Sequence, residues 1–149
     1  MVERRNPPKI KMYEALGLFV DGRVSIDSMF QNQGVCFNPV AKKQYSIQYD
    51  EMSHMITSSD GTSSNEKYLW APALAFLLKI GKLLCDPEIL PFFKKIEWEE
   101  IKKKSNKEDE EALRILLGIF FQQEFPIDKI ENQIENLLEQ LKNLHLKKW

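Results

Sequence analysis

A cluster of lysines between residues 94 and 107 is the densest group of side chains with a possible chemical use in this sequence. Phe92, Phe93 and Trp98 are interspersed with it, and aromatic rings can stack on the bases of single-stranded nucleic acid. Glutamates balance these lysines, and no arginine occurs between residues 24 and 113, although arginine is the side chain best suited to bidentate contacts with phosphates and bases. A contact with RNA or DNA is therefore an alternative function, and its candidate residues are Lys95, Lys102, Lys103, Lys104 and Lys107.

No recognised catalytic or cofactor-binding pattern occurs in the sequence. It lacks the glycine-rich phosphate loops, the G-x-S-x-G nucleophile elbow, the H-E-x-x-H zinc motif and the C-x-x-C pair. The two histidines are far apart in the sequence. We expect His54 to lie in a turn and His145 to lie near the end of a helix, where a cation is favoured. We predict no catalytic residue, no metal site and no cofactor. An enzyme whose site is assembled from dispersed polar residues remains a second alternative.

Length and charge fit one globular domain without a strong electrostatic bias. The chain has 149 residues and a formal net charge of −1, which argues against a DNA coat protein or a polybasic membrane protein. The two cysteines, Cys36 and Cys85, lie in apolar contexts and are expected to be free thiols. No secretory signal or membrane-spanning stretch is recognisable, so we expect a cytoplasmic protein with no membrane partner.

The stretch from Tyr68 to Leu84 is the longest apolar run and is expected to be the central buried helix. Its apolar residues recur at steps of three and four, and they cover more than one face of a helix. Other elements must position any functional side chains around this helix, so we predict that it contributes to a core shared by the whole chain.

The fold class predicted for residues 1–149 is α+β in a single domain. We expect a loose arm over residues 1–8, then a half over residues 9–66 that combines a helix with a small antiparallel meander of three or four strands. The strands are indicated by apolar residues in alternation, with turn residues between them. Residues 67–149 are expected to be helical, to end in a bundle and to share the same core.

Two signals shape the expected helical half. Ser105 and Glu108 match a capping box that would start a helix, and Pro126 would separate that helix from the last one. The last helix carries apolar residues at steps of 3 and 4, which suits either an intramolecular bundle or a partner helix. They are Ile127, Ile130, Ile134, Leu137, Leu141 and Leu144.

The most economical functional prediction is a small non-catalytic protein-interaction module or a subunit of a cytosolic assembly. It would bind another protein, or a second copy of itself, through the last helix, the tyrosine-bearing sheet or both. The candidate contact residues are Tyr45, Tyr49, Ile134 and Leu141.

Overall fold

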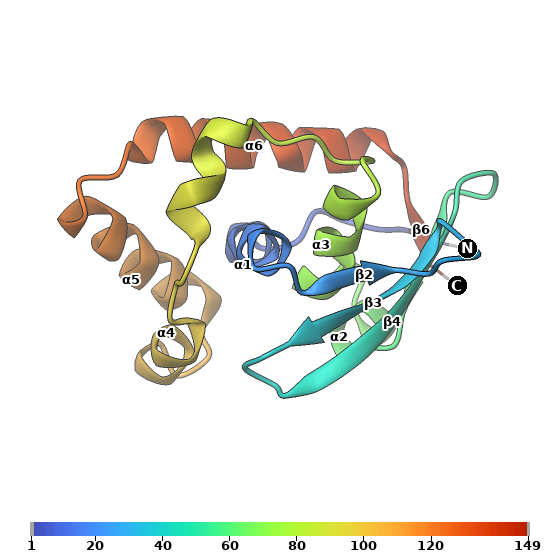
Figure 1. Ribbon diagram of the computed structural model, residues 1–149, viewed down its shortest axis with the longest axis horizontal. Helices are drawn as coiled ribbons and strands as arrows, with labels where there is room; N and C mark the ends of the chain where they lie inside the picture. Colours follow the sequence, from blue (N-terminus) through green and yellow to red (C-terminus); the bar gives the residue numbers. More distant parts are fainter. Residues whose placement is uncertain (1, 149) are drawn as a thin grey trace.

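A six-stranded sheet with helices packed on one of its faces is the frame of the protein (Figure 1). The computed structural model describes residues 2–148. The strands follow the order β1-β6-β5-β4-β3-β2, and all neighbours are antiparallel except the parallel pair β5 and β6. The strands are β1 (Val2–Glu3), β2 (Val24–Ile26), β3 (Gln33–Asn38), β4 (Lys43–Asp50), β5 (Met55–Ser58) and β6 (Lys147–Lys148).

The four strands β2 to β5 form the antiparallel meander that the sequence predicts. In β4, Ile47 and Tyr49 are buried against the helices, whereas Ser46 and Gln48 are exposed on the opposite face. This alternation is the expected consequence of a strand that is covered on one side only. The polar, uncharged side chains of β4 therefore lie on the face that the helices leave open.

The backbone of residues 2–5 is held in place, which corrects the expectation of a loose arm over residues 1–8 for these residues, whereas Met1 lies outside the described part of the chain. β1 pairs with β6, so the two ends of the described chain form one edge of the sheet. The amide of Arg4 donates to the Leu146 carbonyl at 2.8 Å, and the amide of Arg5 donates to the Lys67 carbonyl at 2.7 Å. Sequence composition cannot indicate these bonds, because their partners lie far away along the chain.

The central helix of the predicted core is α3 (Ala71–Lys79), which lies beside α1 (Lys9–Val20) on the covered face of the sheet (Figure 1). Residues 71–78 of α3 are all buried. The helix is shorter than the apolar run. It begins at Ala71 with Pro72 in its first turn, and Gly81 follows its end with a φ of 80°, a conformation that favours glycine. The prediction of a buried central helix is confirmed, with closer boundaries.

The polar stretch 57–65 contains a short capped helix, α2 (Gly61–Asn65), rather than an open loop. Asp60 is fully buried, and its carboxylate accepts hydrogen bonds from the Ser63 amide at 2.6 Å and from the Ser58 hydroxyl. The guanidinium of Arg4 donates to the carbonyls of Ser63 and Ile56, at 2.9 Å and 3.1 Å. This network ties the N-terminal arm to α2 and β5.

The remaining helices surround α1 on the side away from the sheet. They are the 3-10 helix η1 (Pro87–Phe93), α4 (Trp98–Lys104), α5 (Asp109–Gln122) and α6 (Ile127–Asn143). Ser105 ends α4 and its hydroxyl donates to the Lys102 carbonyl, so the predicted capping box with Glu108 is wrong. None of the helices within residues 2–148 combines the length and hydrophobicity needed to cross a membrane.

The apolar seam of α6 belongs to the core. It packs against α1 and α5, and Ile134 and Leu137 are about as buried as any residue of the protein. The intramolecular alternative for this seam is therefore the one that the structure adopts.

Candidate protein-interaction site

The four predicted contact residues do not form a free surface. Ile134 and Leu141 are buried in the α6 seam, which corrects the expectation that they offer a contact to a partner. Tyr49 is buried on the helix-facing side of the sheet, and Tyr45 is half-buried with its ring 5.5 Å from that of Trp70. Side chains that satisfy the core are unavailable to a partner, so a binding surface must come from other residues.

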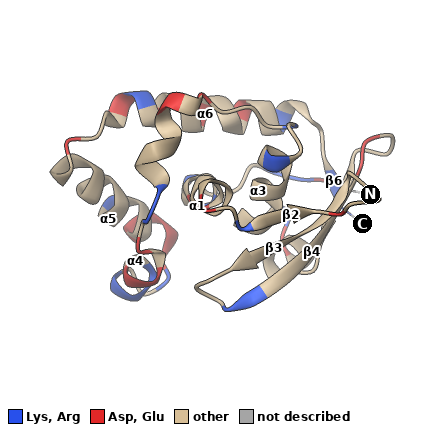
Figure 2. Ribbon diagram, viewed as in Figure 1, with Lys and Arg blue, Asp and Glu red and all other residues tan. Residues whose placement is uncertain are grey.

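The predicted lysines are also divided among different surfaces. Lys102 and Lys107 line a cleft beside α1, Lys95 and Lys104 line a separate groove between α4 and α5, and Lys103 is exposed outside both. Figure 2 shows acidic and basic positions on the same short helix α4, because Glu99 and Glu100 occupy its first turn and three lysines occupy its last. These lysines therefore do not make the continuous basic face that binding along a nucleic-acid backbone requires.

Exposed large hydrophobic side chains mark a different surface. Met29 is 81% exposed, Phe30 is 57% exposed and Met52 is 94% exposed, and all three line one groove at an end of the sheet. Single exposed apolar residues are common on protein surfaces, but a group that shares one concave surface indicates an interaction site. We call this surface the methionine groove. Its described lining residues are Met29, Phe30, Gln31, Asn32, Gln33, Gln48, Tyr49, Asp50, Glu51, Met52, Ser53, Met55 and Thr57.

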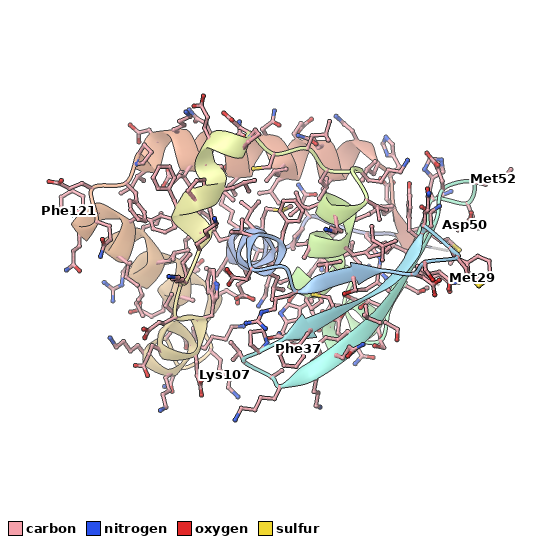
Figure 3. The ribbon with its side chains drawn as sticks, in the orientation of Figure 1. Met29, Phe37, Asp50, Met52, Lys107 and Phe121 are labelled. Carbon is pink, nitrogen blue, oxygen red and sulfur yellow. The ribbon has the colours of Figure 1, made fainter. Side chains whose placement is uncertain are left out.

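Two loops form the walls of the methionine groove, which has a volume of about 840 Å³. Residues 27–32 connect β2 to β3, and residues 51–54 connect β4 to β5. Figure 3 shows Met29, Asp50 and Met52 at the same end of the sheet, with Met52 on the turn that extends furthest from it. The exposed ends of β3, β4 and β5 lie between these loops and form the floor.

Hydrogen bonds to aspartate hold each loop in a defined turn. The carboxylate of Asp27 accepts from the amides of Met29 and Phe30, at 2.8 Å and 3.3 Å. The carboxylate of Asp50 accepts from the amide of Met52 at 3.1 Å. Such turns present the apolar side chains at fixed positions, which lowers the entropy lost on binding.

The charges of the groove are acidic. Among its described lining residues none is Lys or Arg, whereas Asp50 and Glu51 line it and Asp27 lies at the base of one loop. Ser53 and the backbone amides of Met52 and Ser53 surround the Asp50 carboxylate and hold its pKa below the ordinary value, so it is ionised at neutral pH. Lys82 forms an ion pair with Glu51 at 2.7 Å, which leaves Asp27 and Asp50 as the uncompensated charges of this region.

The sequence contains one indication of this groove, which is the presence of large apolar residues in segments that otherwise have the composition of turns. Both loops read as polar turns, but Met29, Phe30 and Met52 are apolar residues that no strand or helix pattern accounts for. Large apolar residues inside predicted turns are candidates for exposure, because loops run over the surface. The sequence does not show that Met29, Phe30 and Met52 lie close together. That proximity results from the pairing of β3 with β2 and β4.

Comparison with known proteins places the chain in a family without assigning it an activity. Searches of curated proteins and of solved structures found no match to the chain. A family model described as uncharacterised conserved protein UCP014422 matches residues 4–147, which is nearly the whole length. The chain belongs to the uncharacterised conserved protein family UCP014422.

Proposed function

We propose that this protein is a non-catalytic interaction module whose methionine groove binds a short, basic and apolar segment of a partner protein. The single observation that carries the proposal is the exposure of Met29, Phe30 and Met52 around one groove. Leaving these side chains in water costs free energy, at about 25 cal/mol per Å² of apolar surface, and a partner that covers them recovers it.

Methionine suits a surface that adapts to its ligand. Its side chain is unbranched and polarisable, and it can repack around partner side chains of different shape. Met29 and Met52 come from opposite walls and Phe30 adds a rigid ring, so an apolar anchor residue inserted between the loops would touch both walls.

The charges around the groove select the rest of the partner. Asp27 and Asp50 lie without a lysine or arginine of the described residues in ion-pair contact. A lysine or arginine on either side of the anchor residue would meet these carboxylates, and complementary charge of this kind raises the association rate and sets specificity. An acidic segment would be repelled.

The free thiols of the two cysteines support a location in the cytoplasm. Cys36 and Cys85 are both free in the structure. Free thiols persist in the reducing cytosol and are less common in oxidising compartments. We propose that the partner is encountered there.

Selection from a random peptide library displayed on phage tests the proposal directly. The wild-type chain is immobilised, and clones that also bind a variant with Met29→Ser and Met52→Ser are removed. We expect the enriched peptides to combine large apolar residues with lysine or arginine. A synthetic copy of an enriched peptide should bind more weakly as salt rises, because exposed charge pairs are screened.

A matched control variant distinguishes binding in the methionine groove from nonspecific hydrophobic binding elsewhere on the surface. Leu84 is 69% exposed and Phe121 is 75% exposed, but neither lines the methionine groove. Changing both to serine removes a similar amount of exposed apolar surface and should leave peptide binding unchanged. Equal loss in the two double variants, or enrichment of acidic peptides, contradicts the proposal. A concentration-dependent dimer that only the groove variant abolishes would identify a second copy as the occupant instead.

A further inference from the structure

We propose that a second site, distinct from the methionine groove, binds a small anion that carries a flat ring and is about the size of a nucleoside monophosphate. The site is a cleft under α1, between the helical layer and the end of the sheet, and we call it the α1 cleft. Its described lining residues are Lys11, Glu14, Asn38, Val40, Ala41, Thr62, Trp70, Lys102, Ser105, Lys107, Asp109 and Ala112.

The size of the α1 cleft is that of a site for one small molecule. Its volume is about 400 Å³, near the lower end of the range of about 300–1,000 Å³ for ligand pockets. α1 provides one wall, α4 and the segment up to α5 provide the second, and the β3–β4 turn with Trp70 provides the third. A ligand bound there would contact both layers of the protein.

Charges in the cleft are mostly paired, and they leave a surplus of positive charge. Lys102 Nζ lies 3.2 Å from Oε1 of Glu14 in an ion pair and donates a hydrogen bond to its Oε2 at 3.3 Å, and Glu14 is only 7% exposed. Lys11 pairs with Asp109 at 3.1 Å. Lys107 makes no ion pair within residues 2–148, so three lysines face two carboxylates and an incoming anion is favoured.

An aromatic wall accompanies this charge. Trp70 is half-buried and lines the cleft, with the Lys102 ammonium 5.7 Å from its ring centroid and Tyr45 packed edge-on against it. The indole N–H of Trp98 is buried without an acceptor among the described residues, and Trp98 borders a small cavity that shares Glu14 and Lys102 with the cleft. Trp98 does not line the α1 cleft itself, and its Nε1 lies against Gly17 of α1, so Trp70 is the aromatic wall available to a ligand.

The backbone at the rim is held in an unfavourable conformation that positions Lys107. Asn106 and Lys107 have consecutive positive φ values of 54° and 62°. The positive φ of Asn106 is the usual one for a residue that ends a helix. The Asn106 amide donates to the Lys103 carbonyl, and the Lys107 amide donates to the Lys102 carbonyl. The second left-handed residue is a lysine, whose Cβ disfavours this conformation. Such strain is concentrated at functional sites.

Isothermal titration with four small probes tests the proposal on the full chain. The probes are adenosine 5′-monophosphate, 4-hydroxybenzoate, adenosine as a ring without charge, and inorganic phosphate as a charge without a ring. We expect at least one of the two aromatic anions to bind with a Kd of about 1 mM or tighter, and at least tenfold more tightly than adenosine or phosphate. Which of them binds distinguishes a phosphate ligand from a carboxylate ligand.

Two exposed lysines provide the matched variants. Lys107→Gln removes the unpaired charge of the cleft and should weaken the aromatic anion about tenfold, the usual effect of losing a charge-assisted contact. Lys103→Gln removes another exposed lysine that does not line the cleft, and it should have no effect. Ala41→Trp at the rim should block binding without disturbing the fold. No binding of either aromatic anion, or an equal effect of the two lysine variants, overturns the proposal.

Discussion

Gly17 of α1 lies directly against the indole ring of Trp98 from α4, and a side chain at position 17 would collide with it. A Cβ atom placed on Gly17 would lie 2.7 Å from Nε1 of Trp98. This close approach brings α4 onto α1, and it places Lys102 within reach of Glu14 one turn further along. A glycine inside a helix is unfavourable by itself, so its position here is explained by packing.

The first prediction concerns this contact. Gly17→Ala should destabilise the protein by about 1–3 kcal/mol, because a rigid indole ring must move to accommodate the methyl group. Gly118→Ala in α5 is the control, since nothing lies within 4 Å of the added carbon. The control should stabilise by about 0.5–1 kcal/mol through helix propensity alone. Urea denaturation of both variants measures the difference, and two stabilised proteins would show that Trp98 does not rest on α1.

A second prediction uses two neighbouring phenylalanines of α5. Phe120 is fully buried, with its ring 5.7 Å from that of Phe93 and 5.6 Å from that of Phe125, whereas Phe121 is 75% exposed. Phe120→Ala should cost about 3–5 kcal/mol, because it leaves a cavity in an aromatic cluster. Phe121→Ala should change the stability by less than about 0.5 kcal/mol. Similar thermal shifts in the two variants would contradict the packing of α5.

Sequence periodicity predicts the part of this fold in which each element follows its own pattern. The alternation around Ile47 and the helical spacing around Phe76 are local consequences of one buried face, so the meander and the central helix were predictable. The arm at Arg4 was not, because its order depends on carbonyls of Ile56 and Ser63 that no spacing rule connects to it. The sequence signal for Ser105 was also ambiguous, since a serine hydroxyl can cap the start of a following helix or donate to a carbonyl three residues before it, as Ser105 does to Lys102.

The candidate sites were less predictable than the fold. Ile134 and Leu141 formed the clearest pattern of the sequence, and that clarity reflects burial rather than an exposed surface. Met29 and Met52 follow no pattern, and their shared groove arises only from the pairing of strands. Surface function leaves little periodic trace, because only the core imposes a period.

A third prediction follows from the buried thiols. Burial raises the pKa of Cys36 to about 12 and that of Cys85 to about 11, above the ordinary thiol value. A group with a raised folded-state pKa stabilises the fold fully below its unfolded value and loses that contribution as pH rises toward the folded value. The stability should therefore fall between about pH 9 and pH 12.

Urea midpoints at about pH 8 and about pH 10.5 measure this loss. A double variant with Cys36→Ala and Cys85→Ala should start from a lower stability, because it loses packing, but decline less across the same interval. Native Cys36 should also resist a thiol reagent at about pH 8 until urea unfolds the chain. An equal decline in both proteins would assign the alkaline loss to other groups.

A fourth prediction concerns the N-terminal arm. Arg4→Ala removes the two side-chain donors that join the arm to β5 and α2 and should cost about 1–3 kcal/mol, since the carbonyls of Ile56 and Ser63 lose partners. Hydrogen exchange at the amides of Arg5 and Lys147 should accelerate, because Arg5 follows Arg4 directly in the arm and Lys147 pairs with Glu3, which precedes it. Arg5→Ala is the control, as its side chain is exposed, and exchange at Lys147 should then be unchanged.

The last prediction links backbone strain at the α1 cleft to binding. Lys107→Gly replaces a residue with a φ of 62° by one that tolerates this conformation, so stability should rise by about 1 kcal/mol. The same variant lacks the unpaired charge and should bind the aromatic anion about tenfold more weakly. Asn106→Gly is the control, because asparagine already tolerates the left-handed region and does not line the cleft. It should gain less stability and keep full affinity. Thermal melting measures the stability of the two variants, and titration measures their affinity for the aromatic anion. A Lys107→Gly protein that is no more stable than wild type would show that the backbone at the rim is not strained.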